Sequence, residues 1–288
     1  MTITLSNKET VLDYINVLKI RETALLTFIG ACSAIIAAGG YFLTQAFVLC
    51  LIAIGLGSAG SNGLTNYLDR EVDARMTRTR NRALASGRIA PPQKVLPLIT
   101  GLIVSALALA WILHPLCFVF GLIGVIASAV WRKTISCTFL GIVAGCTPVL
   151  IGWFALKPVF DLQILLLCCL VAIWTPIHVW SVMVANKEDY SGAGLNYFPL
   201  NLQIKDVVKV LFGLSILLHS VAILIYVTAD FHLLYLTVVS ILGILLICAN
   251  ARLLFSATSV SAWRVYKLSA FPYMGIIFLG MCLDIWLT

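Results

Sequence analysis

The feature that most limits the fold is a series of nine apolar runs, each long enough to cross a lipid bilayer. Of all residues, 61% are hydrophobic and only 11% are charged, which is far from the composition of a soluble domain. Separate apolar segments satisfy their backbone groups in hydrocarbon only as helices. The sequence therefore predicts an all-α integral membrane protein with about nine transmembrane helices. The predicted spans are residues 22–43, 45–65, 95–113, 115–131, 136–155, 162–184, 207–227, 232–251 and 267–287.

Almost all basic residues fall on one side of the predicted membrane. With nine spans, the N-terminus and the even-numbered connections share a side and hold 18 of the 19 Lys and Arg residues, so that only Lys157 falls opposite. The positive-inside rule then predicts a cytoplasmic N-terminus and an external C-terminus in a bacterial or archaeal cell membrane. This topology accounts for the net charge of +7 without a nucleic-acid partner.

A polar stripe stands where the second span meets the following loop. If this run is helical, Asn62, Asn66, Asp69 and Asp73 fall at i, i+4, i+7 and i+11 and share one face. Carboxylate and amide oxygens suit Mg²⁺, which usually binds through one or two carboxylates together with phosphate oxygens of a substrate. The stripe therefore predicts a magnesium site at a membrane surface.

Arginines follow the stripe directly, at positions 75, 78, 80 and 82. A guanidinium is a rigid fork of donors that suits phosphate. Alone, these arginines could equally be a topology signal that holds anionic lipid headgroups. Beside the carboxylate stripe we interpret Arg78 and Arg82 as ligands of a phosphorylated lipid.

A second polar cluster ends the sixth predicted span, four helices after the first. It contains the run 174–180, with Trp174 and His178, and then Lys187, Glu188 and Asp189. The same side and the same offset predict two related four-helix halves plus one helix around a central cavity. The whole chain, residues 1–288, is then one polytopic membrane domain. Its predicted cytoplasmic parts are an N-terminal segment at residues 1–21 and active-site loops at residues 66–94 and 185–206.

In these clusters the sequence resembles the UbiA superfamily of intramembrane prenyltransferases, and within it most closely the protohaem IX farnesyltransferase (haem O synthase) family. The resemblance covers about residues 15–200. Its weaker part is Lys19-x-Arg21 before the first span. The residues that carry it are the runs 66–73 (NYLDREVD), 78–84 (RTRNRAL), 87–89 (GRI), 174–180 (WTPIHVW) and 187–190 (KEDY), with Gly194 and Pro199.

The resemblance implies an enzyme that transfers a farnesyl group from farnesyl diphosphate to a vinyl group of haem b, with Mg²⁺ as cofactor. Haem b is then a substrate, and the product, haem O, serves respiratory terminal oxidases, so contact with a downstream haem-modifying oxidase is conceivable. The implied catalytic residues are Asp69, Asp73, Asp189, Arg78, Arg82 and Lys187, of which the three aspartates hold the metal. The implied substrate-binding residues are Asn62, Asn66, Lys19, Arg21, His178, Trp174 and Tyr190.

The sequence departs from the family pattern at four places near these motifs, one of which is Ala83, where a proline is usual. Thr65 stands where an asparagine is usual, four positions before Asp69, and Cys137 stands at another expected asparagine. The usual Pro-Met-Leu-Pro after the second motif reads Asn-Tyr-Phe-Pro at residues 196–199. These departures bear on the details of metal and acceptor binding more than on the reaction class.

Alternatives remain open at this point. His178 is either a contact of the haem iron, since imidazole is a common haem ligand, or a buried histidine bonded to a neighbouring helix. A related prenyltransferase that acts on a quinone precursor or a lipid would share the first motif. A transporter would also have many spans, but its charges would lie near the middle of the membrane, whereas these lie at helix ends.

Overall fold

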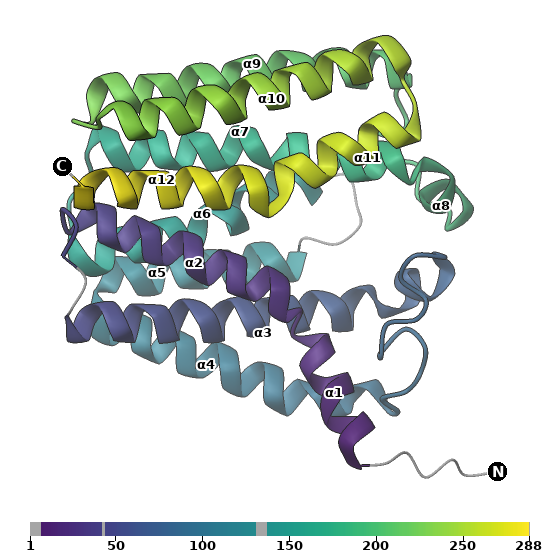
Figure 1. The fold of residues 1–288 in the computed structure, drawn as a ribbon. Helices are drawn as coiled ribbons and strands as arrows, with labels where there is room; N and C mark the ends of the chain where they lie inside the picture. The colour runs from purple at the N-terminus through teal and green to yellow at the C-terminus, as the bar shows by residue number, and fades with distance from the viewer. Residues whose placement is uncertain (1–6, 42–43, 131–136, 288) are drawn as a thin grey trace.

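Long helices run across the molecule and form almost all of its ordered structure (Figure 1). The structure is a computed structural model that describes residues 7–41, 44–130 and 137–287, and no strand occurs in these ranges. Parts of several predicted boundaries, at residues 1–6, 42–43 and 131–136, lie outside the described residues. The helices of the first half are α1 Asn7–Val17, α2 Ile20–Ala37, α3 Gln45–Arg75, η1 Pro92–Val95, α4 Leu96–Leu113 and α5 Pro115–Val130. The remaining helices are α6 Cys137–Leu156, α7 Leu162–Ala185, α8 Lys187–Gly192, α9 Ile204–Thr228, α10 Leu233–Ser256, α11 Ser259–Leu268, η2 Ser269–Tyr273 and α12 Met274–Leu287.

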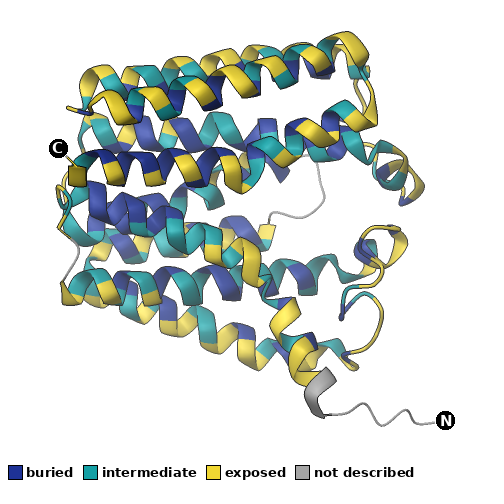
Figure 2. Cartoon of the chain, in the orientation of Figure 1, coloured by how far each residue is buried: buried dark blue, intermediate teal, exposed yellow. Residues whose placement is uncertain are grey.

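The all-α membrane architecture predicted from the sequence is confirmed. Within the described ranges, eight helices are long and apolar enough to cross a membrane, with α11, η2 and α12 counted as one segment. The ninth predicted span is α5, an apolar helix of 16 residues, so the count of nine is not settled by length. Figure 2 shows buried residues on the inward faces of α6, α7 and α12 and exposed residues on the outer faces of the bundle.

The polar stripe of the first motif lies on a helix that is longer than predicted. α3 has 31 residues and therefore spans about 46 Å, whereas a hydrocarbon core is about 30 Å thick. Residues 66–75, expected in a loop, are the last turns of this helix, and the loop begins at Met76. The loop after α3, the short helix α8 and α11 all lie at the same end of the bundle, opposite the C-terminal end of α12 (Figure 1).

Close contacts between helices hold the bundle together. An added Cβ at Gly152 of α6 would lie 2.2 Å from the carbonyl oxygen of Gly30 in α2, so only glycine permits this crossing. The hydroxyl of Ser33 donates to the carbonyl of Val149 at 2.8 Å beside it. Small residues thus bring α2 and α6 together, as small residues do between membrane helices.

The last predicted span, residues 267–287, contains a break that the apolar pattern did not show. α11 ends at Leu268, and Ala270 has a non-helical ψ of −143° before α12 begins. Pro272 lies in the break and cannot supply a backbone N–H to a continuous helix. The break exposes polar groups of Ser269 inside the bundle, where they contact α7.

Candidate active site

A cavity opens at the end of the bundle that carries both motifs. It has a volume of about 430 Å³ and is bordered by α2, α3, α4, α5, α6, α7 and α11. Much of its wall is made of small residues, including Gly57, Ser58, Gly124 and Gly145. Glycine and serine add little side-chain volume to the wall, which leaves room for a chamber between these helices.

One end of this cavity is polar and charged. The stripe on α3 contributes Asn62, Thr65 and Asp69, and the loop after it contributes Arg78 and Arg82. The start of α2 adds one base and one acid at the same end, Lys19 and Glu22. The apolar chamber and the charged end belong to one continuous cavity. A single ligand with a hydrocarbon tail in the chamber and an anionic head at the charged end therefore fits it.

The predicted stripe is helical, but its four members face two different spaces. Asn62 and Asp69 border the cavity, whereas Asn66 and Asp73 border a second pocket. At about 100° per residue, Asp69 falls about 20° short of Asn62 around the helix and Asp73 falls about 20° beyond it. Arg82 is one of the side chains that border both spaces.

Arg82 connects the loop to the second half of the stripe. Its Nη1 donates to Asp73 at 2.7 Å and to the amide oxygen of Asn66 at 3.3 Å. The Asp73 side chain is 1% exposed and that of Arg82 is 36% exposed, so the ion pair is half-buried. The amide nitrogen of Asn66 donates to the carbonyl of Val17 at 2.6 Å, which fixes the junction between α1 and α2.

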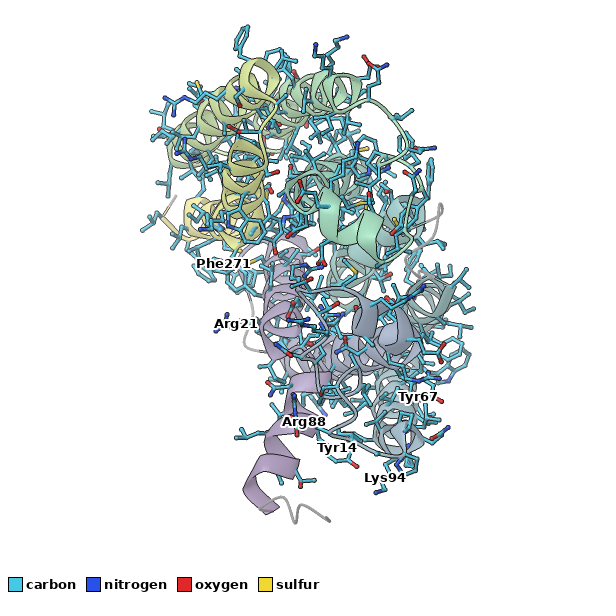
Figure 3. All side chains as sticks on the ribbon, turned by 90° about the vertical axis from the view of Figure 1, so that its right-hand side faces the viewer. Tyr14, Arg21, Tyr67, Arg88, Lys94 and Phe271 are labelled. Carbon is cyan, nitrogen blue, oxygen red and sulfur yellow. The ribbon has the colours of Figure 1, made fainter. Side chains whose placement is uncertain are left out.

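Lys19 lies where α1 turns into α2, with a φ of 49°. Its ammonium donates to Thr65 at 3.3 Å, and burial together with the nearby Arg82 charge lowers its pKa to about 8. Arg21, predicted with it as a substrate contact, borders the second pocket, and Figure 3 shows its side chain extending sideways from α2. Of the two residues, Lys19 alone borders the cavity, so it is the better placed to contact a substrate there.

The second motif meets the first through Asp189. Its carboxylate accepts hydrogen bonds from the backbone N–H groups of Thr77 at 2.6 Å and Arg78 at 3.2 Å. Burial favours the neutral acid, but these two donors outweigh it and lower the pKa of Asp189. Neither Asp189 nor Lys187 is among the described residues that border the cavity. Asp189 instead ties α8 to the arginine loop.

Tyr190 does border the cavity, as predicted, and Tyr197 joins it. Burial raises the pKa of both hydroxyls, so both are neutral donors at physiological pH. Arg78 interacts with the hydroxyl of Tyr190, and Cys137 with that of Tyr197. Two departures from the family pattern, Cys137 and Tyr197, are thus neighbours at this cavity.

His178 lies at the cavity wall, where two aromatic rings and one hydroxyl contact it. Its ring stacks on Trp174, with centroids 5.0 Å apart, and packs on Tyr266 at 4.7 Å. Its Nδ1 lies 3.2 Å from the hydroxyl oxygen of Ser269, and that hydroxyl donates its single proton to the carbonyl of Tyr266. With the Ser269 hydroxyl directed at Tyr266, Nδ1 carries the hydrogen and the lone pair lies on Nε2. Trp174 donates to the carbonyl of Ser269, so the break before α12 positions both aromatic side chains.

The three predicted metal ligands, Asp69, Asp73 and Asp189, do not lie together in one group. In the part of the chain that the structure describes, no three of His, Cys, Asp and Glu form a group that could hold a metal ion. Asp69 faces the cavity, Asp73 pairs with Arg82, and Asp189 binds backbone amides. Asp69 and Glu22 are the carboxylates of the described cavity wall, and this donor set fits Mg²⁺ when phosphate oxygens complete the shell.

Sequence reasoning missed several residues of this site. Glu22 and Tyr197 stand beside predicted residues and could have been found by helical spacing or loop proximity. Tyr266 and Ser269 follow about 90 residues after His178 and carry no motif. Only the fold brings Tyr266 to the cavity wall and Ser269 to His178.

The sequence profile of the UbiA prenyltransferase family matches residues 24–274. The chain belongs to this family. A protohaem IX farnesyltransferase of Desulforudis audaxviator is 31% identical to this UbiA chain, with 97% of this chain and 90% of the relative covered. One of Symbiobacterium thermophilum is 32% identical and covers 98% and 96%. The protein is thus a membrane enzyme of the prenyltransferase class.

Solved structures of UbiA proteins share the fold. The structure of a digeranylgeranylglyceryl phosphate synthase has a TM-score of 0.79 at 18% identity and covers 97% of this chain and all of its own. A UbiA homologue from Archaeoglobus fulgidus, solved with GPP and Mg²⁺, has a TM-score of 0.66 at 16% identity and covers 93% and 99%. These identities support the architecture alone.

Proposed function

We propose that this UbiA enzyme is a haem O synthase, which transfers a farnesyl group from farnesyl diphosphate to a vinyl group of haem b. The observation that carries the proposal is the cavity, in which a charged end with Arg78 and Arg82 continues into an apolar chamber bordered by His178. The relatives named protohaem IX farnesyltransferase, at about 30% identity over nearly the whole chain, support the same acceptor.

The reaction requires an allylic cation and a place for its leaving group. The C–O bond to diphosphate breaks, and its electron pair leaves with the diphosphate. The vinyl group then forms a C–C bond to the allylic carbon, and water adds to the resulting cation and loses a proton, which leaves a hydroxyl. Arg78, Arg82 and protonated Lys19 hold the developing negative charge, and one such donor contributes about 3–4 kcal/mol.

Mg²⁺ would supply Lewis-acid neutralisation of the diphosphate when bound. Asp69 is the residue we place on the metal first, because it borders the cavity with Asn62. Asp73 supports this end through Arg82, and Asp189 supports it by holding the loop that carries Arg78. The three predicted metal ligands thus divide into one contact and two positioning residues in this proposal.

The acceptor would lie against the His178 side of the cavity. The Nδ1 proton is committed to Ser269, so the Nε2 lone pair suits an axial or orienting contact with haem iron. Trp174 and Tyr266 add flat apolar area against which a porphyrin can pack. The chamber excludes bulk water from the cation until the C–C bond has formed.

We further propose that the end of the bundle with the arginine loop faces the cytoplasm. All basic residues but Lys157 belong to that side in a nine-span topology, and Lys157 pairs with Asp161 between α6 and α7. The loops at residues 76–91 and 193–203 are then cytoplasmic parts of the site. Farnesyl diphosphate would enter with its head at this surface and its tail in the bilayer.

The test is incubation of membranes containing the enzyme with farnesyl diphosphate, Mg²⁺ and haem b, with the pigments separated by mass. We expect a farnesylated, hydrated haem, and its absence while a quinone precursor or lipid is prenylated would assign the protein to another acceptor. Asp69→Asn should abolish turnover with any acceptor, whereas retained turnover would remove Asp69 from the metal proposal. The matched control is Asp206→Asn, which alters an exposed surface carboxylate.

A further inference from the structure

A second pocket lies behind the charged end of the cavity, between the junction of α1 with α2 and the arginine loop. Its volume is about 710 Å³. Four charged side chains border both spaces and so form the wall between them: Lys19, Glu22, Arg78 and Arg82. The two spaces are therefore separated by side chains alone at this point.

The second pocket carries an excess of positive charge. Its basic side chains are Lys19, Arg21, Arg78, Arg82 and Arg88, against two acidic ones, Glu22 and Asp73. Arg82 already neutralises the buried Asp73 at 2.7 Å, and Arg88 pairs with Asp13 at 2.9 Å, which leaves Lys19, Arg21 and Arg78 against Glu22. The remaining excess favours a multivalent anion with several oxygens, because guanidinium groups bind phosphate oxygens as paired donors.

Arg88 is a fixed part of this pocket. Its Nε donates to Asp13 at 2.9 Å, and its Nη1 donates to the carbonyl of Asn81 and the hydroxyl of Ser86, both at 3.0 Å. Figure 3 shows Arg88 close to α1, at the end of the molecule that carries the loop. Arg88 borders this pocket and not the cavity, so a substitution of Arg88 tests binding in the second pocket alone.

We propose that the second pocket binds inorganic pyrophosphate, the leaving group of the reaction, after it has passed the wall of shared side chains. The proposal rests on the proposed prenyl transfer, which forms one pyrophosphate for each farnesyl group. Pyrophosphate is a multivalent anion, so it leaves at the charged end of the cavity, where the second pocket lies, and not through the apolar chamber. The shared residues give it charged contacts on both sides of the wall, so it exchanges one set of partners for another while it leaves.

The wall is built from contacts that can change. The Lys19 ammonium reaches Thr65 at 3.3 Å on a flexible side chain, and Arg82 is partly exposed to the second pocket. Both can turn toward an anion in either space without movement of a helix. Arg82 is then the side chain that accompanies the anion from the cavity.

The test measures binding of labelled pyrophosphate to the purified full-length protein in nanodiscs, with Mg²⁺ and saturating farnesyl thiodiphosphate, an unreactive analogue that fills the cavity. We expect pyrophosphate still to bind, at one site per chain. Arg88→Gln should weaken this binding about ten-fold or more, since a hydrogen bond to a charged group is lost. Asp13→Asn breaks the same ion pair but keeps the Arg88 charge, so its pyrophosphate affinity should match or exceed that of the unaltered protein.

Complete loss of pyrophosphate binding in the presence of the analogue would overturn the proposal, because the protein would then have one diphosphate site. Equal weakening in Arg88→Gln and Asp13→Asn would also overturn it, since the loss would come from a displaced α1. Failure of the analogue itself to bind would count against the proposed prenyl transfer and not against the second anion site.

A lipid headgroup has the same phosphate chemistry, so nanodiscs of phosphatidylcholine and of phosphatidylglycerol are compared. Similar pyrophosphate affinity in both supports a free anion as the occupant. Displacement of pyrophosphate by phosphatidylglycerol at constant ionic strength would assign the pocket to a lipid headgroup and remove the exit route.

Discussion

The Arg82–Asp73 ion pair gives the sharpest quantitative test of the site. The perturbation is a double-mutant cycle of Arg82→Gln, Asp73→Asn and the combined variant. Removing Arg82 leaves the carboxylate of Asp73, which is 1% exposed, without the guanidinium that lies 2.7 Å away. The matched control is the same cycle on Arg70 and Glu71, which pair at 2.9 Å but with Glu71 80% exposed.

The size of the effect follows from distance and exposure. Two charges about 4 Å apart interact by about 4 kcal/mol at an effective dielectric constant of about 20. The guanidinium of Arg82 is 36% exposed, so water screens part of this interaction, and we expect a coupling free energy of about 2 kcal/mol. The exposed control pair should give less than about 0.5 kcal/mol.

The assay is unfolding in mixed micelles of dodecyl maltoside and sodium dodecyl sulfate, followed by helical circular dichroism. Activity is a second readout, because Arg82 also borders the cavity: Arg82→Gln should lower kcat/KM for the prenyl diphosphate at least about 100-fold. A coupling free energy as small as that of the control pair would show that the half-buried pair contributes nothing particular. Unchanged kcat/KM would remove Arg82 from the diphosphate site.

Three further predictions concern the frame of the site. Gly152→Ala should destabilise the protein by about 1–3 kcal/mol in the same unfolding assay, because the added Cβ would meet the Gly30 backbone. The control is Gly101→Ala, whose Cβ meets nothing within 4 Å and which should cause no loss of stability. Equal effects of the two variants would contradict the close crossing of α2 and α6. Ser269→Ala should lower haem affinity about five-fold and change the haem absorption spectrum, since the partner that fixes the His178 tautomer is lost; an unaltered spectrum would argue against this contact. The affinity for the prenyl diphosphate should fall as the pH rises through about 8, because the pKa of Lys19 lies there and its charge is lost above it; Lys19→Arg should flatten the profile, and a profile that keeps its slope in this variant would assign the titration to another group.

The sequence predicted the helices and the two motifs well because their signals are local. Apolar length marks a membrane helix, and the spacing of Asn62 and Asp69 marks one face of a helix whatever surrounds it. The boundary between α4 and α5 was likewise predicted, since the expected spans end at residue 113 and begin at residue 115, and Pro115 suits the first position of a helix. Local patterns sufficed for these elements.

The partners of the site residues could not be predicted, since they depend on long-range contacts. Asp189 resembles a metal ligand by its motif, but the loop after α3 presents backbone N–H groups to it. Asp73 shares a helix face with Asp69, yet a small rotation around the helix and the reach of Arg82 place it in another pocket. Ser269 becomes a partner of His178 only because Pro272 interrupts the last helix.

The length of α3 sets the height of the reaction relative to the bilayer. Asp69 lies 24 residues after Gln45, or about 36 Å along the helix, so it stands about 6 Å beyond a hydrocarbon layer of about 30 Å if the helix starts at the opposite boundary. In the proposed reaction, the bond that breaks would then lie where the hydrated head of the substrate ends and its hydrocarbon tail begins. The length of the helix would thus fix the depth of the site, and the thickness of the surrounding membrane would affect the rate of the reaction.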